Sequence, residues 1–230
     1  MPIVNGTLLE IRFTESGLAG LVDCPRAVRP GPGQYLIASS QREEEALPVT
    51  LFSMSLPDEP LQVSPPLPAG WYPGLTLRLR GPLGHGFTLP REARRVALVA
   101  YQSPAGLLLS LTRFALKQGA AVTLCSTFPP PPALPEEVEV LPFSQLKEAV
   151  AWADYLAAAF AREHYAELRQ LLGNHLQERA SLSAEGLILT PMPCAGLGSC
   201  GVCAVHTRAG WKHICLDGPV FSLRSLEEAP

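Results

Sequence analysis

The sequence lacks a long apolar run, an excess of positive charge and a signal for export. No stretch approaches the ~20 apolar residues of a membrane-spanning helix, so we expect no membrane partner. Lysine and arginine number 18 against 21 acidic residues, which leaves no basic surface for nucleic acid. Residues 1–13 show no basic stretch followed by an apolar block, so we expect a cytoplasmic protein.

The common catalytic signatures are missing as well. The 230 residues contain no P-loop, no Ser–His–acid triad, no paired-carboxylate site and no internal repeat. Apolar residues make up 47% of the chain, enough for a sizeable core in one large or two small domains. The 24 prolines favour turns and stiff connections over long helices. We therefore expect a globular protein built from short elements.

What the sequence does contain is a dense group of cysteines. Four of the six lie in one stretch with the spacing C-x5-C-x2-C-x11-C, namely Cys194, Cys200, Cys203 and Cys215. Thiolates are soft ligands, and four of them can complete the ligand shell of an iron–sulfur cluster or a structural zinc. Glycines between these cysteines permit positive φ and let backbone N–H groups approach a negatively charged cluster. The stretch is therefore our candidate metal site.

The spacing favours a 2Fe–2S cluster over the alternatives. It resembles the plant-type C-x4-C-x2-C pattern with a distant fourth cysteine, with one more residue in the first gap. Structural zinc usually shows two C-x2-C pairs, and disulfides need an oxidising compartment. His206 and His213 lie in the same stretch, so a histidine-ligated cluster stays open, although four cysteines suffice. Cys24 and Cys125 lie in strand-like contexts and are expected to be buried.

The first 90 residues read as an antiparallel β unit. Residues 76–80 alternate polar and apolar, which is typical of a strand with one buried face. Many short strands with Pro/Gly turns predict a small barrel or a sandwich. The predicted strands are Thr7–Phe13, Gly20–Val22, Gln34–Ala38, Val49–Met54, Leu61–Val63 and Leu75–Arg80.

The pattern changes near residue 93 to that of an α/β unit. Val96–Ala100 is an uninterrupted apolar run, as a strand buried on both faces requires. A helical pattern over Pro104–Gln118 and a second apolar run at Ala121–Cys125 complete a β-α-β unit, which implies a parallel sheet. Further along we predict a strand at Val138–Leu141 and a helix at Ser144–Ala151 with Ser144 as its N-cap. The first half of Trp152–Phe160 is predicted to be a strand, and its second half is also compatible with a helix. A helix at Glu163–His175 and a strand at Leu187–Leu189, which closes the sheet before the cysteine loop, complete the prediction.

Several motifs together resemble one family. PMPCAGLGSCGVCAV at residues 191–205 and GWKHICLDGPVFSL at residues 210–223 are similar to the cluster-binding tail of dihydroorotate dehydrogenase electron-transfer subunits. These iron–sulfur flavoproteins belong to the ferredoxin-reductase superfamily. Pro32–Tyr35, Gly81–Phe87 and Ala151–Asp154 resemble three further motifs of the family. The matching motifs occur along the whole chain in the same order as in the family, and only those of the tail are specific to it.

The resemblance implies a fold with three parts. Residues 1–92 would form an antiparallel β-barrel like those that bind flavin. Residues 93–189 would form a parallel-sheet domain like those that bind nucleotides, and residues 190–230 the 2Fe–2S segment. The four clustered cysteines carry over as cluster ligands.

It also implies an electron-transfer function. In the family, hydride from NADH reduces FAD, and the cluster relays single electrons to or from the FMN of a catalytic subunit that converts dihydroorotate in pyrimidine biosynthesis. The chain would then be an oxidoreductase subunit without a substrate-converting site of its own, working in a hetero-oligomer.

The flavin and nucleotide motifs are weaker than the cysteine motif. The family holds flavin with Arg-Pro-(Leu/Ile)-Ser, whereas residues 47–53 read LPVTLFS; the arginine is missing, and Arg42 lies in a different register. Thr50 and Ser53 can still donate hydrogen bonds to FAD. The first β-α turn, residues 100–106, keeps one glycine and adds a tyrosine, which argues against NAD binding.

A second hypothesis is a non-redox module. In it the weak nucleotide motifs are relics, and the cysteines hold zinc or a purely structural cluster that stabilises a docking scaffold. The weak motifs favour this hypothesis, and the complete cysteine set with its glycine-rich loop favours the first.

Overall fold

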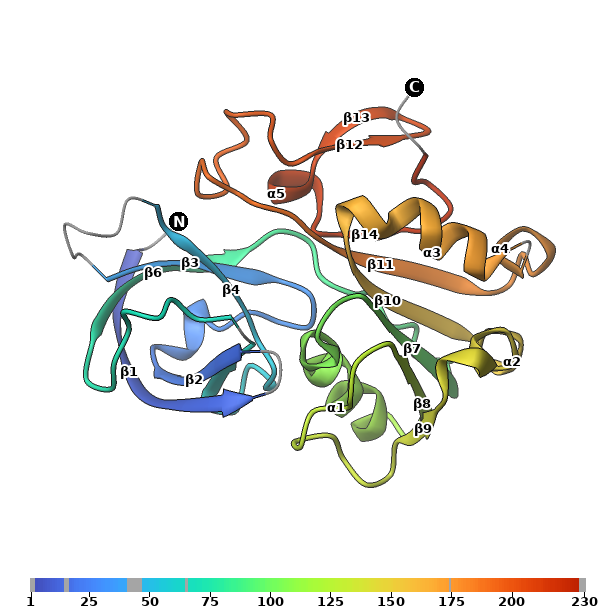
Figure 1. The fold of residues 1–230 in the computed structure, drawn as a ribbon, viewed down its shortest axis with the longest axis horizontal. Coiled ribbons are helices and arrows are strands. Elements are labelled where there is room, and N and C mark those ends of the chain that lie inside the picture. The colour runs from blue at the N-terminus through green and yellow to red at the C-terminus, as the bar shows by residue number, and fades with distance from the viewer. Residues whose placement is uncertain (1–2, 15–16, 41–46, 65, 174, 228–230) are drawn as a thin grey trace.

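The structure is a computed structural model, and it describes residues 3–14, 17–40, 47–64, 66–173 and 175–227. Within these residues the strands form two six-stranded sheets and a two-stranded hairpin. The N-terminal sheet and the helix-covered second sheet lie side by side, and the C-terminal segment runs across the top of both (Figure 1). The fold is thus a mixed β and α/β arrangement, as expected from the change of pattern near residue 93.

The first sheet is antiparallel throughout. Its order is β4-β3-β6-β1-β2-β5, with bounds β1 Ile3–Thr14, β2 Gly17–Asp23, β3 Tyr35–Ser39, β4 Val49–Phe52, β5 Leu61–Val63 and β6 Thr76–Leu83. Leu77 and Leu79 of β6 are fully buried, while Thr76 and Arg78 face outward, which explains the alternating sequence. Backbone bonds from Met54 to Gln62 and from Ser64 to Phe52 join the chain after β4 to β5, at the two edges of the sheet.

The second sheet has five parallel strands and one antiparallel strand. Its order is β14-β11-β10-β7-β8-β9, with bounds β7 Arg95–Tyr101, β8 Ala121–Ser126, β9 Glu139–Leu141, β10 Tyr155–Ala161, β11 Ser183–Leu189 and β14 Val220–Ser222. Val96 and Leu98 of β7 pack on the α1 side, and Ala97 and Val99 on the side of α2 and α3. Both faces are buried, so the strand is apolar without alternation.

Short helices cover this sheet. The α-helices are α1 Leu109–Lys117, α2 Leu146–Trp152, α3 Tyr165–Leu172 and α4 His175–Glu178, and the 3-10 turns on this sheet are η2 Ala105–Leu108, η3 Phe143–Gln145 and η4 Arg162–His164. A further 3-10 turn, η1 Arg26–Val28, packs against β6 of the first sheet. No described helix is both long and apolar enough to cross a membrane.

Two local expectations were wrong, and one alternative that the sequence left open is resolved. Ser144 does not cap α2, because η3 precedes the helix and its N-cap is Gln145, without a side-chain bond. Residues 157–160 are strand rather than helix, since β10 is buried in the middle of the sheet and small alanines fit between the layers. The sheet does not close at β11: the chain returns after the cysteine loop and adds β14 beside it, pairing Leu187 with Val220.

The C-terminal segment contacts both sheets. After the cysteine loop it forms the hairpin β12 Ala204–Thr207 and β13 Gly210–His213, the short helix α5 Ile214–Asp217, and then β14. The Tyr35 hydroxyl on β3 donates to the Cys215 carbonyl at 2.7 Å. His85 after β6 bridges to Pro219. The loop is therefore held between the first sheet and the edge of the second.

Candidate metal centre and the sheet edge beside it

The fold brings the four clustered cysteines into two pairs. Cys194 and Cys200 lie within hydrogen-bonding distance in the loop after β11. Cys203 and Cys215 flank the β12–β13 hairpin, and a bond of 3.0 Å from the Ile214 N–H to the Cys203 carbonyl sets them side by side. The charges of Cys194 and Cys203 both act on Cys215, so the two pairs face one site. The structure thus places the predicted ligands in two neighbouring pairs.

Exposure differs between the pairs. Cys203 and Cys215 are 0% and 2% exposed, whereas Cys194 is half-buried and Cys200 is exposed. The site therefore has a dry inner side and an outer side open to solvent. By contrast, Cys24 and Cys125 are buried elsewhere, as predicted, and burial raises the pKa of Cys125 to about 11.

Backbone N–H groups favour the thiolate form of Cys194. Burial alone would raise its pKa, but the N–H groups of Ser199, Leu197 and Cys200, with the Cys200 thiol, outweigh this and lower the pKa to about 6. At Cys215, burial and then the neighbouring Cys203 raise the pKa to about 12, against the Gly198 N–H. Metal coordination, which deprotonates thiols, would supply the missing positive charge there.

Two glycines explain why the loop can take this shape. Gly196 and Gly198 have φ of 74° and 71°, the left-handed region that L side chains avoid. A Cβ on Gly196 would lie 2.6 Å from the Tyr35 Oη, the atom that bonds to Cys215. The expected role of glycine in admitting backbone N–H groups to the site is consistent with this conformation.

Two arginines hold the loop, and sequence reasoning missed both. The Arg80 guanidinium on β6 donates to the Ala195 carbonyl. Arg162, just after β10, donates to the Val202 and Ala204 carbonyls at 2.6 and 3.1 Å. A cation beside a thiolate-bound cluster offsets its negative charge and raises its potential. Nothing in the local sequence distinguishes either residue, because only tertiary folding brings them to the cysteines.

The two histidines of the segment differ in their surroundings. The His206 Nδ1 lies 3.4 Å from the Glu227 Oε2, and its ring meets Trp211 edge-on at 5.2 Å. At His213 it is the backbone N–H that donates to the Asp217 carboxylate, at 2.8 Å. Among the described residues, no three His, Cys, Asp or Glu side chains converge as they would around a single ion.

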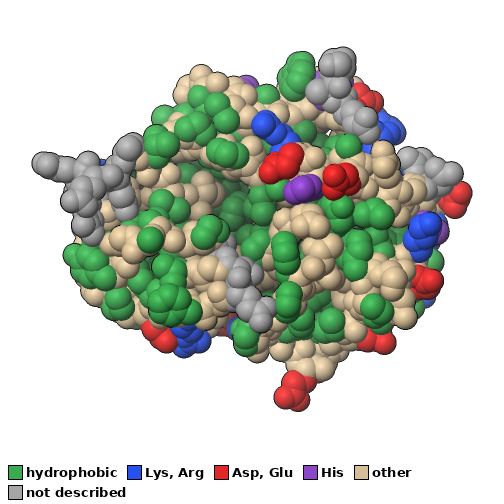
Figure 2. Space-filling model, in the orientation of Figure 1, with side chains coloured by type: hydrophobic (Ala, Val, Ile, Leu, Met, Phe, Trp, Pro, Cys, Tyr) green, Lys and Arg blue, Asp and Glu red, His purple; other side chains and the backbone are tan. Residues whose placement is uncertain are grey.

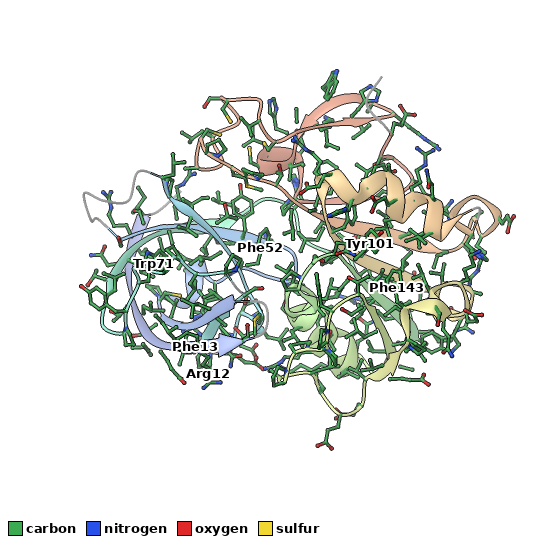
Figure 3. The ribbon with its side chains drawn as sticks, in the orientation of Figure 1. Arg12, Phe13, Phe52, Trp71, Tyr101 and Phe143 are labelled. Carbon is green, nitrogen blue, oxygen red and sulfur yellow. The ribbon has the colours of Figure 1, made fainter. Side chains whose placement is uncertain are left out.

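A cleft between the two sheets lies beside the metal centre. It has a volume of about 330 Å³, and Figure 2 shows the hollow with hydrophobic side chains in its depth. Phe52 lies on the side of the first sheet that faces the second (Figure 3). The lining comprises Thr50, Phe52, Ser64, Pro66, Pro104, Leu107, Ala161, Glu163, Leu189, Thr190 and Pro191. A flavin held by the two predicted contacts, Thr50 and Ser53, would need both residues to line this cleft.

The cleft includes Thr50 but not Ser53. The Ser53 hydroxyl is buried, where it donates to the Ser55 carbonyl at 2.8 Å and accepts from the Ser55 N–H at 3.2 Å. The cleft's apolar walls suit a flat ring system, but Glu163 is the one charged residue in its described lining. That lining does not fit the diphosphate of FAD, which calls for cations. Arg42 lies outside the described residues.

Comparison with known proteins gives different results for the C-terminal tail and for the chain as a whole. Residues 190–227 match the family model described as the iron–sulfur cluster binding domain of dihydroorotate dehydrogenase B. The tail is similar to that domain. A putative dihydroorotate dehydrogenase B (NAD(+)) electron transfer subunit from Thermotoga maritima is 58% identical over 26 residues, 11% of this chain and 12% of its own. The sulfhydrogenase 1 subunit gamma of Pyrococcus furiosus is 49% identical over 39 residues, 17% of this chain and 13% of its own.

The whole chain has structural relatives of low identity. A solved NADH-dependent reduced ferredoxin–NADP oxidoreductase superposes with a TM-score of 0.74 at 17% identity, over 96% of this chain and 89% of that one. A ferredoxin NADP+ reductase from Neisseria gonorrhoeae with bound FAD and NADP gives 0.57 at 14% identity, over 80% and 98%. The resemblance is confirmed: the fold is like that of ferredoxin reductases, and the tail is similar to the iron–sulfur cluster binding domain of dihydroorotate dehydrogenase B.

At the carboxyl edge of the parallel sheet, aromatic rings fill the end of β7. The strand order reverses between β7 and β10, where open α/β sheets bind nucleotides. There Tyr101 stacks on Phe143 at 5.6 Å (Figure 3), meets His164 edge-on at 6.0 Å and donates to the Glu167 carboxylate at 2.9 Å. The buried Ser103 hydroxyl donates to the Ala159 carbonyl at 2.8 Å. The turn's polar groups are thus used within the protein.

Several large apolar side chains of the C-terminal segment are exposed to solvent. Trp211 is 60% exposed. Three more large side chains of the segment are also exposed, namely Leu197, Val202 and Leu216. They surround the exposed Cys200 in sequence and carry no charge. Exposed apolar side chains gathered at a functional site are typical of a protein-binding surface.

Proposed function

We propose that the chain is an electron-transfer subunit that relays single electrons through a 2Fe–2S cluster held by Cys194, Cys200, Cys203 and Cys215. The observation that carries this proposal is the arrangement of the four thiols in two pairs around one site. A two-iron cluster takes two protein ligands on each iron, so two pairs suit it better than a single tetrahedral ion.

The residues around the cluster would each have a defined task. The cluster supplies one-electron chemistry when bound. The N–H groups of Ser199 and Gly198 stabilise negative charge on the sulfurs, and Arg80 fixes the loop while adding positive charge. Tyr35 covers the inner side, where Cys215 is buried, and excludes water.

The partner we propose is the FMN-containing catalytic subunit of a dihydroorotate dehydrogenase, in a hetero-oligomer serving pyrimidine biosynthesis. Support comes from the tail's similarity to that enzyme's cluster domain and from the exposed apolar side chains Trp211 and Leu216 of the same segment. The chain would be an oxidoreductase subunit without its own substrate-converting site. A cytoplasmic location stays a prediction.

If FAD binds, its ring would take the cleft beside the cluster, with Thr50 donating to it. The described lining offers the diphosphate no cation, so the proposal assigns no electron-transfer step to a flavin. The division into residues 1–92, 93–189 and 190–230 stays part of this proposal. So does closure of the first sheet into a barrel, which the Ser53–Val63 bridge supports.

The alternative is a structural module that holds zinc or a structural cluster. The aromatic rings at the sheet edge and the acidic Glu163 in the cleft favour it, since neither suits a nucleotide phosphate. The pairing of the cysteines favours the redox proposal.

Anaerobic purification with a visible spectrum and assays for iron, sulfide, zinc and flavin tests these proposals. About two irons and two sulfides per chain are expected, with reduced protein passing electrons to a purified catalytic subunit. Zinc in a colourless protein would overturn the redox function. If flavin is present, Thr50→Val should lower its content, while the matched Ser53→Ala should not.

A further inference from the structure

Arg162 is exposed, yet its guanidinium is bonded to the cysteine loop. The residue opens the turn η4, directly after the buried strand β10 in the interior of the second sheet. Its Nη1 donates to the Val202 carbonyl at 2.6 Å and to the Ala204 carbonyl at 3.1 Å. Ordering a long exposed side chain costs conformational entropy, and a single surface contact returns little free energy. What sets these two bonds apart is their position, because they reach the residues on either side of Cys203.

The orientation of Cys203 depends on the two peptide groups that join it to its neighbours. The first carries the Val202 carbonyl, which accepts from Arg162, and the second carries the Cys203 carbonyl, which accepts from the Ile214 N–H at 3.0 Å. Peptide groups are planar, so restricting both of them restricts φ and ψ of the residue between them and the direction of its Cβ. The Cys203 side chain is fully buried. Arg162 therefore helps to set the direction in which the Cys203 sulfur points.

The predicted ligands are attached to different sheets. On the first sheet, the Arg80 guanidinium donates to the carbonyl of the residue after Cys194. Tyr35 of the same sheet donates to the carbonyl of Cys215. Arg162 belongs to the second sheet and acts on the remaining inner cysteine. The ligand set thus spans two sheets, and Arg162 ties it to the second.

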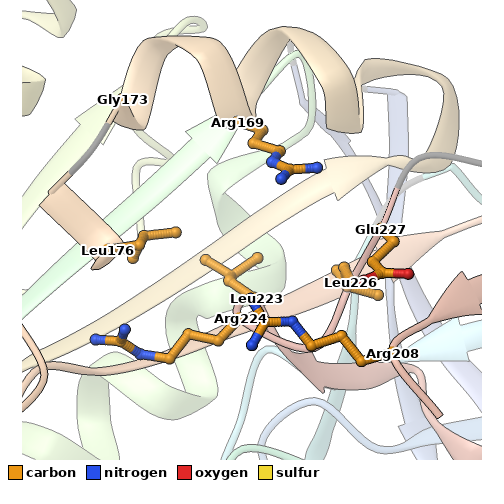
Figure 4. Close-up of a pocket in the computed structure, with 8 residues that line it drawn as sticks. All are labelled: Arg169, Gly173, Leu176, Arg208, Leu223, Arg224, Leu226 and Glu227. Atoms are coloured by element: carbon orange, nitrogen blue, oxygen red, sulfur yellow. The ribbon is translucent and has the colours of Figure 1, made fainter. Parts of the chain in front are cut away.

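The second sheet also holds the far end of β12. The Tyr165 hydroxyl at the start of α3 donates to the Leu226 carbonyl at 2.9 Å, and Leu226 forms a bridge with Thr207, the last residue of β12. In Figure 4, Leu226 lies below α3, where it belongs to the core of the second sheet. Strand β12 is therefore held at both ends, by Arg162 at the end next to the buried cysteine and by Tyr165 at the other.

We propose that Arg162 is a positioning residue of the metal centre, which holds Cys203 against the second sheet and raises the reduction potential of the bound cluster by its charge. The first part applies to any metal that the four clustered cysteines bind, and the second rests on the proposed 2Fe–2S function. A guanidinium bonded beside a ligand keeps a positive charge near the cluster, and a positive charge favours the reduced form, which carries one more electron. The two parts are measured separately.

Metal release tests the positioning role. In the full-length, cluster-loaded protein, Arg162→Met keeps an apolar stem but loses both bonds. Loss of iron to a chelator should be about fivefold faster than in the wild type, the factor expected for one net hydrogen bond. Arg162→Lys should restore most of the difference, because a single nitrogen makes both bonds in the wild type. Equal release from the wild type and Arg162→Met would overturn the positioning role.

Arg94→Met is the matched control. The Arg94 Nη1 also donates to two carbonyls, those of Arg91 and Ala93, at 3.1 and 3.4 Å. It is exposed as Arg162 is, but it lies just before β7, at the amino end of the sheet, whereas Arg162 follows the carboxyl end of β10. The variant should release iron as the wild type does and keep its potential. Equally fast release from Arg94→Met and Arg162→Met would show that any lost surface bond has this effect, and would also overturn the positioning role.

The midpoint potential tests the effect of the charge. Potentiometric titration followed by electron paramagnetic resonance should give a lower potential for Arg162→Met than for the wild type, and a value close to the wild type for Arg162→Lys. Because the guanidinium is exposed, the difference should shrink when salt is raised from about 0.01 M to about 1 M, where the Debye length falls to about 3 Å. An unchanged potential, or a difference that does not respond to salt, would overturn the charge effect.

The metal content of the wild type separates this inference from the proposed function. If the wild type holds zinc, the redox function and the charge effect both fail, while the release of zinc still tests the positioning role. If it holds no metal, alkylation of Cys203 by iodoacetamide replaces metal release. The buried thiol should then react faster in Arg162→Met than in the wild type or in Arg94→Met, and equal rates would overturn the positioning role. The free energy of unfolding confirms that each variant is folded.

Discussion

At the carboxyl edge of the parallel sheet, side chains bond to one another; in the cysteine loop, backbone N–H groups point at sulfur. Tyr101 is engaged by Phe143, His164 and Glu167 and the turn after it by Ser103, so a ligand would have to displace existing contacts. The cysteine loop is arranged in the opposite way. Its N–H groups lower the pKa of Cys194, and its arginines bond to carbonyls rather than to the thiols.

This difference between the two regions shows that a fold does not by itself determine which of its possible sites can bind a ligand. One region has its polar groups bonded to other side chains and carbonyls of the protein, and the other keeps backbone N–H groups directed at the cysteine sulfurs. A site is therefore recognised by where its hydrogen-bond donors point, and the same fold can retain one site while filling another.

The largest effect is expected from removing an inner cysteine. Cys203→Ser should abolish iron and sulfide binding, because the residue is buried and its partner Cys215 would be left unpaired. Cys125→Ala is the matched control: it should keep the iron and cost only about 1 kcal/mol from a small cavity. Iron content and urea unfolding measure both. Full iron in Cys203→Ser would refute the ligand assignment.

Two glycines of the same loop sharpen the comparison further. Gly196→Ala should destabilise the protein by about 3 kcal/mol, since it combines positive φ with a clash against Tyr35. Gly201→Ala shares the positive φ, but its Cβ would meet no atom within 4 Å, so about 1 kcal/mol is expected. The free energy of unfolding and the iron content distinguish them. Equal losses would show that the contact with Tyr35 is unimportant.

At the sheet edge, Tyr101→Ala should lower the unfolding free energy by about 2 kcal/mol through lost ring packing. Tyr101→Phe keeps the stack and loses only the bond to Glu167, so about 0.5 kcal/mol is expected. Neither change should alter cofactor content. A drop in bound nucleotide in Tyr101→Ala would instead show that the ring contacts a ligand, and the sheet edge would then no longer differ from the cysteine loop in this respect.

The smallest effect concerns the opposite, amino end of the sheet. Asp154 accepts bonds from the Arg95 guanidinium and from two backbone N–H groups, which hold the pKa of its carboxyl below the ordinary value. A lowered pKa means that this carboxylate stabilises the fold above its unfolded pKa of about 4, and that the gain disappears as the pH falls through the folded pKa. The pair is exposed, so less than about 1 kcal/mol is at stake.

Asp154→Asn should therefore lose a little stability at pH 7 and show a flatter decline of unfolding free energy toward acid pH. Urea unfolding between pH 7 and pH 3 measures this slope. An unchanged slope would mean that Asp154 has the same pKa in the folded and unfolded chains.

Local sequence patterns predicted the strands well and the tertiary contacts poorly. Residues 76–80 alternate and form β6, and the apolar run 96–100 forms β7, because burial on one or two faces leaves a direct trace in the sequence. The short strand β14 was missed, since three residues carry no periodicity. The four cysteines were predicted from spacing alone, and Arg80 and Arg162 were not, because a guanidinium that reaches a distant carbonyl has no local signature.

The path of the chain between β11 and β14 has a consequence for engineering and for evolution. These strands are antiparallel neighbours, so the whole cysteine segment is an insertion within what would otherwise be a hairpin. A short turn in its place would leave the order of the strands unchanged. The segment's contacts with the rest of the molecule include those of Tyr35, His85 and the two loop-holding arginines.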